Sequence, residues 1–101
     1  MTEDLELSIS VRLSCQRALL GAIIPNIRLI TVGWDNLNMF YLRAYYDVIP
    51  SENDIDDMNA VLGEIFADID FKKDNGVECI QDIRPMKELE LYKWVVYERK
   101  E

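Results

Sequence analysis

The pattern of apolar residues predicts a helix over residues 8–24. Four apolar side chains recur there at four- or seven-residue spacing: Ile9, Leu13, Leu20 and Ile24. Polar residues fill a second stripe, which holds Arg12, Gln16 and Arg17. This arrangement is typical of an amphipathic helix, and Pro25 would end it. The alternative is a short strand over residues 4–10 that leads into a helix from Val11, because apolar and polar residues alternate strictly from Leu5 to Leu13.

A second helix is predicted after Pro50, and its pattern is the clearest in the chain. Ser51 is a good N-cap, and Asp54 stands three positions later, as a capping box requires. The apolar residues that follow are spaced by three, four, three and four positions: Ile55, Met58, Leu62, Ile65 and Ile69. One face of this helix should therefore be buried, with acidic residues on its outer side.

Four stretches are rich in β-branched and aromatic residues and predict strands: residues 27–34, 39–48, 77–83 and 91–99. A turn over residues 35–38 makes the first two an antiparallel hairpin, and the Asp-Asn-Gly sequence at 74–76 predicts a turn before the third. In the second strand one face carries Phe40, Leu42, Ala44 and Tyr46. The other face carries Met39, Tyr41, Arg43 and Tyr45.

The predicted fold is a single α+β domain over residues 1–101. Its order is α-β-β-α-β-β, and we expect a two-layer sandwich in which two helices cover one face of a four-stranded antiparallel sheet. A strand at residues 4–10 would instead make the fold similar to a ferredoxin-like split βαβ unit. The sequence contains no internal repeat and no linker.

Negative charge is concentrated in one part of the chain. Residues 47–75 hold nine acidic residues against two lysines, so nine minus two accounts for seven of the eight net negative charges. Such a distribution steers positive partners and repels polyanions. We therefore expect a basic protein partner and no binding to nucleic acid, where phosphate neutralisation supplies most of the affinity.

The distribution of apolar residues predicts a cytoplasmic protein that does not bind membranes. The longest apolar run, at residues 18–24, is far shorter than the roughly 20 residues needed to cross a bilayer. Three acids near the start, Glu3, Asp4 and Glu6, stand where a signal peptide would carry positive charge.

The residue types also restrict the chemistry. The chain has no histidine, so neither a Ser-His-Asp nor a Cys-His nucleophile can form. Cys15 and Cys79 have no CxxC companion; two buried thiols are the favoured interpretation and a disulfide is the alternative. Starting an EF-hand loop at Asp54 or Asp68 places Met58 or Lys72 at the fifth position, where a ligand is required. We expect no metal, no cofactor and no catalytic residue, and a carboxylate-based enzyme is the weakest alternative.

Two groups of residues are candidates for binding a partner. The acidic group would supply charge complementarity: Asp54, Asp56, Asp57, Glu64, Asp68 and Asp70. If both helices cover one face of the sheet, Tyr41, Arg43 and Tyr45 point to solvent on the other, where aromatic and arginine side chains often anchor interfaces. The alternatives are a solvated helix face that keeps the protein soluble, and tyrosines that are present because they favour strands.

Two blocks of the sequence resemble those of small bacterial proteins. The first is Leu-Ser-Cys-Gln-Arg-Ala-Leu-Leu-Gly at residues 13–21, followed by Pro25, and the second is Trp-Val-Val-Tyr-Glu-Arg-Lys-Glu at residues 94–101. Small acidic bacterial proteins of this size are similar to the immunity partners of secreted antibacterial toxins. The resemblance implies a protective, toxin-binding role and no catalytic residues.

The sequence therefore predicts a protein-binding module, an immunity protein that neutralises a bacterial toxin by masking its active site. The expected partner is a basic toxin domain. A homodimer that pairs through the open sheet face is the alternative. The sequence alone decides neither the oligomeric state nor which of the two candidate surfaces is the interface.

Overall fold

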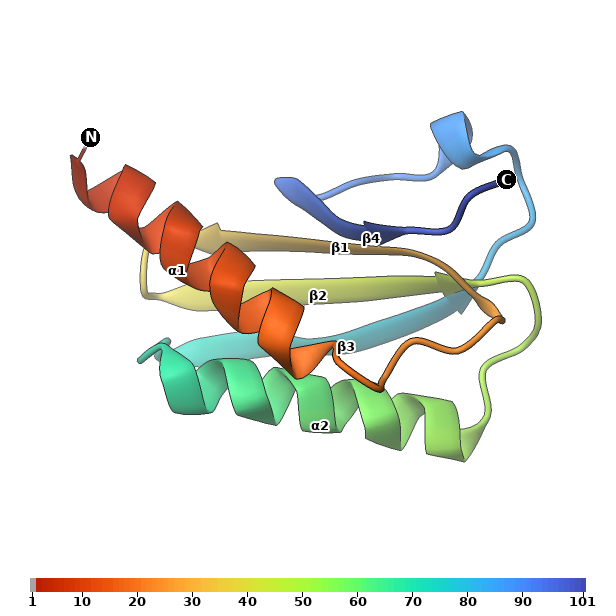
Figure 1. The fold of residues 1–101 in the computed structure, drawn as a ribbon, viewed down its shortest axis with the longest axis horizontal. Helices are drawn as coiled ribbons and strands as arrows, with labels where there is room; N and C mark the ends of the chain where they lie inside the picture. The colour runs from red at the N-terminus through yellow and green to blue at the C-terminus, as the bar shows by residue number, and fades with distance from the viewer. Residues whose placement is uncertain (1) are drawn as a thin grey trace.

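A computed structural model of the protein describes residues 2–101, with side chains from Leu5 onward. Two helices lie beside one four-stranded sheet, in the predicted order (Figure 1). The elements are α1 (Thr2–Ala18), β1 (Ile27–Asp35), β2 (Met39–Tyr46), α2 (Glu52–Asp68), β3 (Lys73–Gln81), the 3-10 turn η1 (Met86–Glu88) and β4 (Trp94–Glu98). None of the helices in this described part is long and apolar enough to span a bilayer.

The sheet is mixed, so the prediction of a purely antiparallel sheet is wrong. Its strand order is β3-β2-β1-β4; β1 pairs antiparallel with β2 and β4, whereas β2 and β3 run parallel. The cause is α2, which has 17 residues and is about 25 Å long. It returns the chain along the length of β2, so β3 starts from the same end of the sheet as β2.

The first helix is correctly predicted in type but not in its bounds. Residues 4–10 are helical, so the alternative of a leading strand is wrong. The helix ends at Ala18, seven residues before Pro25, because the chain turns at Gly21, whose φ of 78° belongs to the left-handed region. Without a leading strand the fold does not have the ferredoxin-like order.

Three of the four apolar residues that indicated this helix lie away from the core, whereas Ile24 follows the helix and packs against the core. Ile9, Leu13 and Leu20 are 49%, 55% and 80% exposed. The buried face of α1 instead carries small side chains, Val11, Ser14, Cys15 and Ala18. Small residues allow the helix to pack closely on α2 and the sheet, so α1 has apolar residues on both its inner and its outer face.

The prediction of the second helix and its capping box is confirmed. Ser51 accepts a hydrogen bond from the backbone N–H of Asp54, whose carboxylate accepts one from the N–H of Ser51, and the capping box is complete. Four of the five predicted stripe residues are buried, namely Met58, Leu62, Ile65 and Ile69, while Ile55 at the N-terminus of α2 is 39% exposed.

The main core lies between the helices and the sheet. On β2 it contains the predicted face: Phe40, Leu42, Ala44 and Tyr46. Residues 74–76 are not a turn before β3 but an irregularity inside it, because Phe40 pairs with Asp74 and Leu42 pairs with Val77. The extra residue is accommodated by Gly76, which has a φ of 77°. Both cysteines are free, and burial raises the pKa of the Cys15 thiol to about 12.

Candidate functional site

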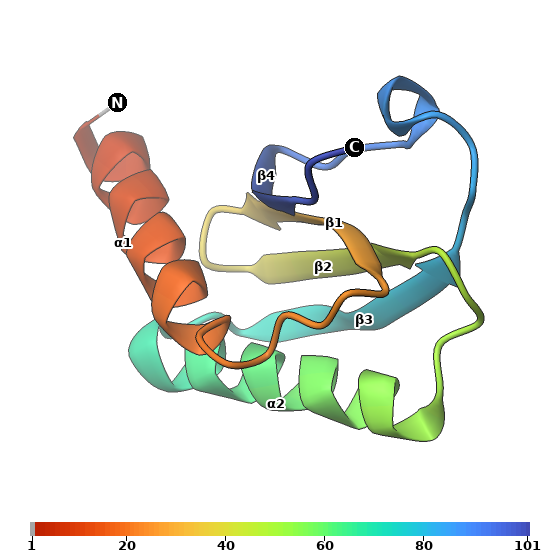
Figure 2. The same ribbon diagram turned by 45° about the vertical axis from the view of Figure 1, so that its right-hand side comes forward.

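The face of the sheet opposite the helices is covered by the chain between β3 and β4. After β3 the chain passes through η1 and returns beside β4 (Figure 2). This segment places Leu89 against Leu29 and Tyr45, with Ile80 and Met86 at the margin, as a small second core. Tyr45 is 2% exposed, and its hydroxyl donates to the backbone oxygen of Glu90 at 2.8 Å. The expectation that Tyr45 points to solvent is therefore wrong.

Arg43 is also largely enclosed on this face. Its guanidinium lies 3.2 Å from the Glu78 carboxylate and 3.1 Å from the Tyr92 hydroxyl, and its side chain is 15% exposed. The Tyr92 hydroxyl also donates to Glu78, and burial together with this hydrogen bond raises the pKa of Tyr92. Both terminal nitrogens of Arg43 are thus engaged inside the molecule, since Nη1 also lies 3.4 Å from the Tyr45 hydroxyl, while its Nε is buried without a hydrogen-bond partner.

Tyr41 is the member of this group that stays nearest the surface. It is half-buried, its ring lies 5.4 Å from the ring of Tyr92, and its hydroxyl donates to the Asp35 carboxylate at 2.6 Å. The sequence placed Tyr41, Arg43 and Tyr45 on one face correctly. It did not reveal that residues 82–93 would cover that face, because the covering segment has no periodic pattern of its own.

The six candidate acids lie on α2 and just after it, but they differ in what they contact. Asp54 takes part in the capping box. Asp68 accepts hydrogen bonds from Ser14 and from Arg17, each at 2.8 Å. Over residues 5–101, where side chains are described, no lysine or arginine nitrogen lies within ion-pair distance of the other four acids, which are Asp56, Asp57, Glu64 and Asp70.

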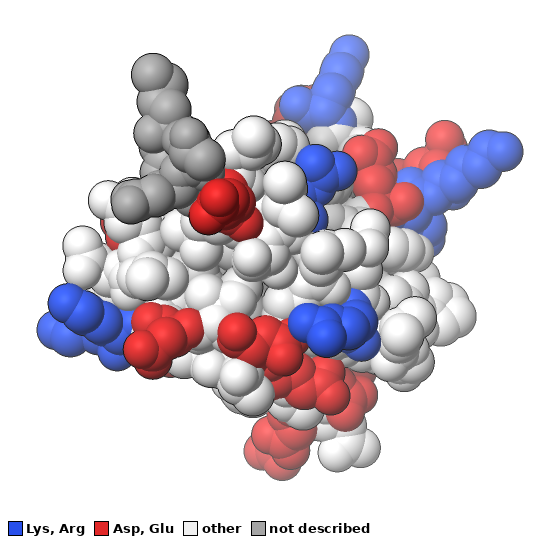
Figure 3. Space-filling model, turned by 60° about the vertical axis from the view of Figure 1, so that its left-hand side comes forward, with Lys and Arg blue, Asp and Glu red and all other residues white. Residues whose placement is uncertain are grey.

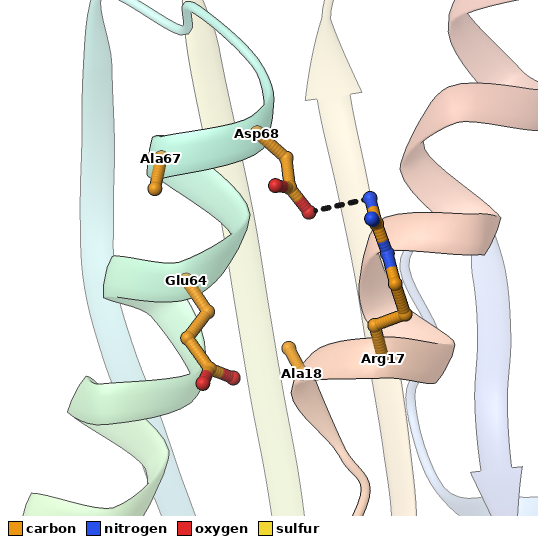
Figure 4. Close-up of a pocket in the computed structure, with 5 residues that line it drawn as sticks. All are labelled: Arg17, Ala18, Glu64, Ala67 and Asp68. Carbon is orange, nitrogen blue, oxygen red and sulfur yellow. Dashed lines mark hydrogen bonds and ion pairs between the residues drawn. The ribbon is translucent and has the colours of Figure 1, made fainter.

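A shallow groove runs between the end of α1 and the outer side of α2. One hollow of about 230 Å³ is lined by Arg17, Ala18, Glu64, Ala67 and Asp68 (Figure 4). A neighbouring hollow of about 220 Å³ shares Ala18 and Glu64 and adds Leu20, Gly21, Ala22, Asp57, Ala60 and Val61. The groove lining therefore contains several small residues, and α2 contributes the acids Asp57, Glu64 and Asp68 to it. Figure 4 shows Arg17 reaching across to Asp68, with the Glu64 carboxylate left on the groove wall.

Two further hollows also border α1. One of about 600 Å³ lies between α1 and the β1–β2 turn and is lined by Glu6, Leu7, Ser10, Asn36, Leu37, Asn38 and Lys72. The other, of about 150 Å³, lies on the outer face of α1 beside Ile9, Arg12, Leu13 and Gln16. This outer face was not predicted as a site, although the strict four-residue spacing of Leu5, Ile9 and Leu13 was a signal for it.

The charges are arranged unevenly over this side of the molecule. Figure 3 shows acidic side chains gathered along the lower edge, where α2 lies, with basic side chains at the left end and at the upper right of this row, beneath an area that carries little charge. Within residues 5–101 no group of three or more acidic, cysteine or histidine side chains is placed to hold a metal ion. Exposed apolar patches beside grooves and charged rows are typical of surfaces that bind another protein.

Comparison with known families identifies the kind of protein. The sequence profile of the MafI2 immunity proteins matches residues 8–101, which is nearly the whole chain, and the chain belongs to this family. It is an immunity protein, which neutralises a toxin, so its partner is a toxin. The resemblance to toxin-immunity partners is thus confirmed, and membership of this family suggests a non-enzymatic role. No curated protein matches the chain at a significant level.

Proposed function

We propose that this immunity protein neutralises its toxin by covering the toxin's active site with the acidic side of α2. The observation that carries the proposal is the row of acids along the groove, where Asp57 and Glu64 have no cationic partner among the described side chains. Unpaired carboxylates favour a basic surface, and a toxin that acts on a polyanion would carry such a surface around its active site. The partner is therefore a basic toxin domain.

The other candidate residues have different parts in this proposal. Asp56 and Asp70 extend the negative field, and Asp54 and Asp68 contribute their charges while serving the fold. Tyr41 was the expected aromatic anchor, but it lies on the face of the sheet opposite the helices and so stands outside the surface proposed here. Tyr45 is buried and Arg43 is paired with Glu78. The role of these two residues is therefore to support Tyr41 and residues 82–93, which cover this face.

The acidic side of α2 also disfavours other classes of ligand. Its charge disfavours nucleic acid and anionic membranes as ligands, and the protein acts in the cytoplasm as a binder without catalytic activity of its own. A homodimer through the sheet face has less support, since residues 82–93 cover most of that face.

Stopped-flow association with the toxin that this protein neutralises tests the charge argument. Between low and high salt the association rate constant should fall by about tenfold or more, because screening weakens steering. The triple variant D56N/D57N/E64Q should lose most of this salt dependence. The matched control E88Q/E90Q/E98Q removes the same number of exposed charges away from α2 and should keep it.

Masking is tested by competition. A substrate analogue bound in the toxin's active site should compete with the immunity protein in a binding titration. Simultaneous binding of both would show that inhibition acts from outside the active site. Salt-independent association, or equal effects of the two triple variants, would count against the acidic surface.

A further inference from the structure

The outer face of α1 carries a row of large apolar side chains that the fold leaves uncovered. Leu5, Ile9 and Leu13 follow one another at four-residue spacing and are 62%, 49% and 55% exposed. Residues four apart lie on the same side of a helix, one turn above the other. The three side chains therefore form a continuous ridge, called here the α1 ridge, about 12 Å long from first to last residue.

The fold itself does not use the α1 ridge. The helix is attached through its opposite face, where Val11, Ser14 and Cys15 are at most 1% exposed. Single exposed apolar residues are common on proteins, but three in register on one helix make a patch, and such patches mark interaction sites. A shallow hollow beside Ile9 and Leu13 makes the surface of this patch uneven.

The surroundings of the α1 ridge indicate what kind of partner fits it. On one side lie Arg12 and Trp94, whose ring is 5.0 Å from the guanidinium and 36% exposed. On the other side lies the groove with Glu64 and Asp57. An apolar centre with charged groups at its rim is the usual construction of a protein interface. The rim is basic at Arg12 and acidic at Asp57 and Glu64, so a partner that fits it has basic groups on the α2 side of an apolar depression.

Charge also argues against two other occupants of the α1 ridge, a second copy of the chain and a membrane. A second copy would bring one net charge of −8 onto another, which opposes self-association. Amphipathic helices that lie on membranes carry basic residues on their polar face, whereas here Arg12 and Arg17 are accompanied by Glu6 on α1 and by Asp57 and Glu64 on the groove wall. A basic toxin satisfies both the apolar ridge and the acidic side of its rim.

We propose that the α1 ridge is the apolar centre of the toxin contact, and that it inserts into an apolar depression on the toxin in the manner of a helix binding a groove. This inference rests on the proposed function and deepens it by naming the surface that holds the complex together. The α2 acids set the rate of encounter, whereas the α1 ridge sets the lifetime of the complex.

The test compares two double variants in binding to the toxin that this protein neutralises. I9A/L13A shortens the α1 ridge, and I49A/I83A removes two isoleucines that are 77% and 76% exposed in the links after β2 and β3. We expect I9A/L13A to raise the dissociation rate constant and Kd by about a hundredfold, with an association rate constant within about threefold of the unmodified protein. I49A/I83A should change Kd by less than about threefold.

The outcomes are distinguishable. If I9A/L13A keeps its melting temperature and binds the toxin as tightly as I49A/I83A does, the α1 ridge is not the contact, while salt-dependent inhibition would still uphold the proposed function. If the unmodified protein fails to inhibit the toxin at all, the proposed function fails first. Light scattering that finds a dimer for the unmodified protein and a monomer for I9A/L13A would assign the ridge to self-association and overturn the inference.

Discussion

The hydroxyl of Ser14 donates to the carboxylate of Asp68 at 2.8 Å and so ties α1 to the last turn of α2. Arg17, one turn further along α1, reaches the same carboxylate oxygen at 2.8 Å. Ser14 is 1% exposed, whereas the Arg17 side chain is 68% exposed. The buried hydroxyl therefore depends on Asp68 much more than the exposed guanidinium does.

Replacing Asp68 should destabilise the protein through Ser14. In D68A the buried hydroxyl loses its acceptor, and we expect the free energy of unfolding, measured by urea denaturation, to fall by about 1–3 kcal/mol. E64A, which removes an exposed carboxylate from the same groove, should change it by less than about 0.5 kcal/mol. The double variant S14A/D68A should recover part of the loss, since no buried hydroxyl is then left unpaired. Equal losses in D68A and E64A would contradict this assignment.

Tyr45 should matter for stability and not for toxin association. Removing its buried ring in Y45A should reduce the free energy of unfolding by about 3–5 kcal/mol, whereas Y45F loses only the hydrogen bond to Glu90 and should cost about 1 kcal/mol. Per folded molecule, Y45F should bind the toxin with unchanged Kd. Y41F removes the hydroxyl that bonds Asp35 at the surface and serves as the exposed comparison. A Kd raised more by Y45F than by Y41F would restore Tyr45 as a contact residue.

Glu101 should make stability depend on pH in the acid range. Both of its oxygens accept hydrogen bonds from the buried Arg28, at 2.8 and 2.9 Å, and Arg99 adds a further pair. Chiefly through the Arg28 bond, the pKa of Glu101 falls from 4.5 to about 2. A carboxyl whose folded pKa is depressed stabilises the protein above its unfolded pKa, and this contribution is lost as pH falls from about 4.5 to about 2.

The measurement is the melting temperature at pH 7 and at several values between pH 5 and pH 2.5. E101Q should melt lower than the unmodified protein at pH 7, and the difference should shrink as the pH falls. The exposed Glu88 offers a control, E88Q, for which no such convergence is expected. Parallel curves for E101Q and the unmodified protein would contradict the ion pair.

The capping box at the start of α2 gives a further test. S51A removes the side chain that accepts from the N–H of Asp54 at 3.1 Å, and it should lower the free energy of unfolding by about 1 kcal/mol. S10A replaces an exposed serine inside α1, where alanine favours the helix, and should be neutral or slightly stabilising. Both values come from urea denaturation, and an S51A variant as stable as S10A would contradict the cap.

How far the sequence predicted the fold depended on whether a pattern had one interpretation or two. The hairpin of β1 and β2 and the helix α2 were predicted because strand alternation, a capping residue and a single apolar stripe agreed. In α1 both faces carry apolar residues, so periodicity located the helix but could not decide which face is buried. Packing decided it, because the small side chains of Ser14, Cys15 and Ala18 allow a closer approach than Leu13 would.

The candidate site was predictable only in part for a similar reason. Acids such as Asp57 and Glu64 are exposed on α2 as their spacing indicated. The burial of Tyr45 depends on the segment through η1, whose course is set by tertiary contacts such as Leu89 against Leu29 and not by a local pattern. Nor did the sequence indicate that β3 would run parallel to β2, since strand direction follows from the path of the connecting helix.

Cys15 lies on the buried face of α1, so the reactivity of its thiol reports on the motion of this helix. A thiol that is 1% exposed and protonated at neutral pH reacts with an alkylating reagent only after α1 lifts away from α2 and the sheet. In a C79A background, the rate of alkylation therefore measures how often that separation occurs. A toxin seated on the outside of α1 would hold the helix down, and the slowing of this reaction would register docking without any label placed at the interface.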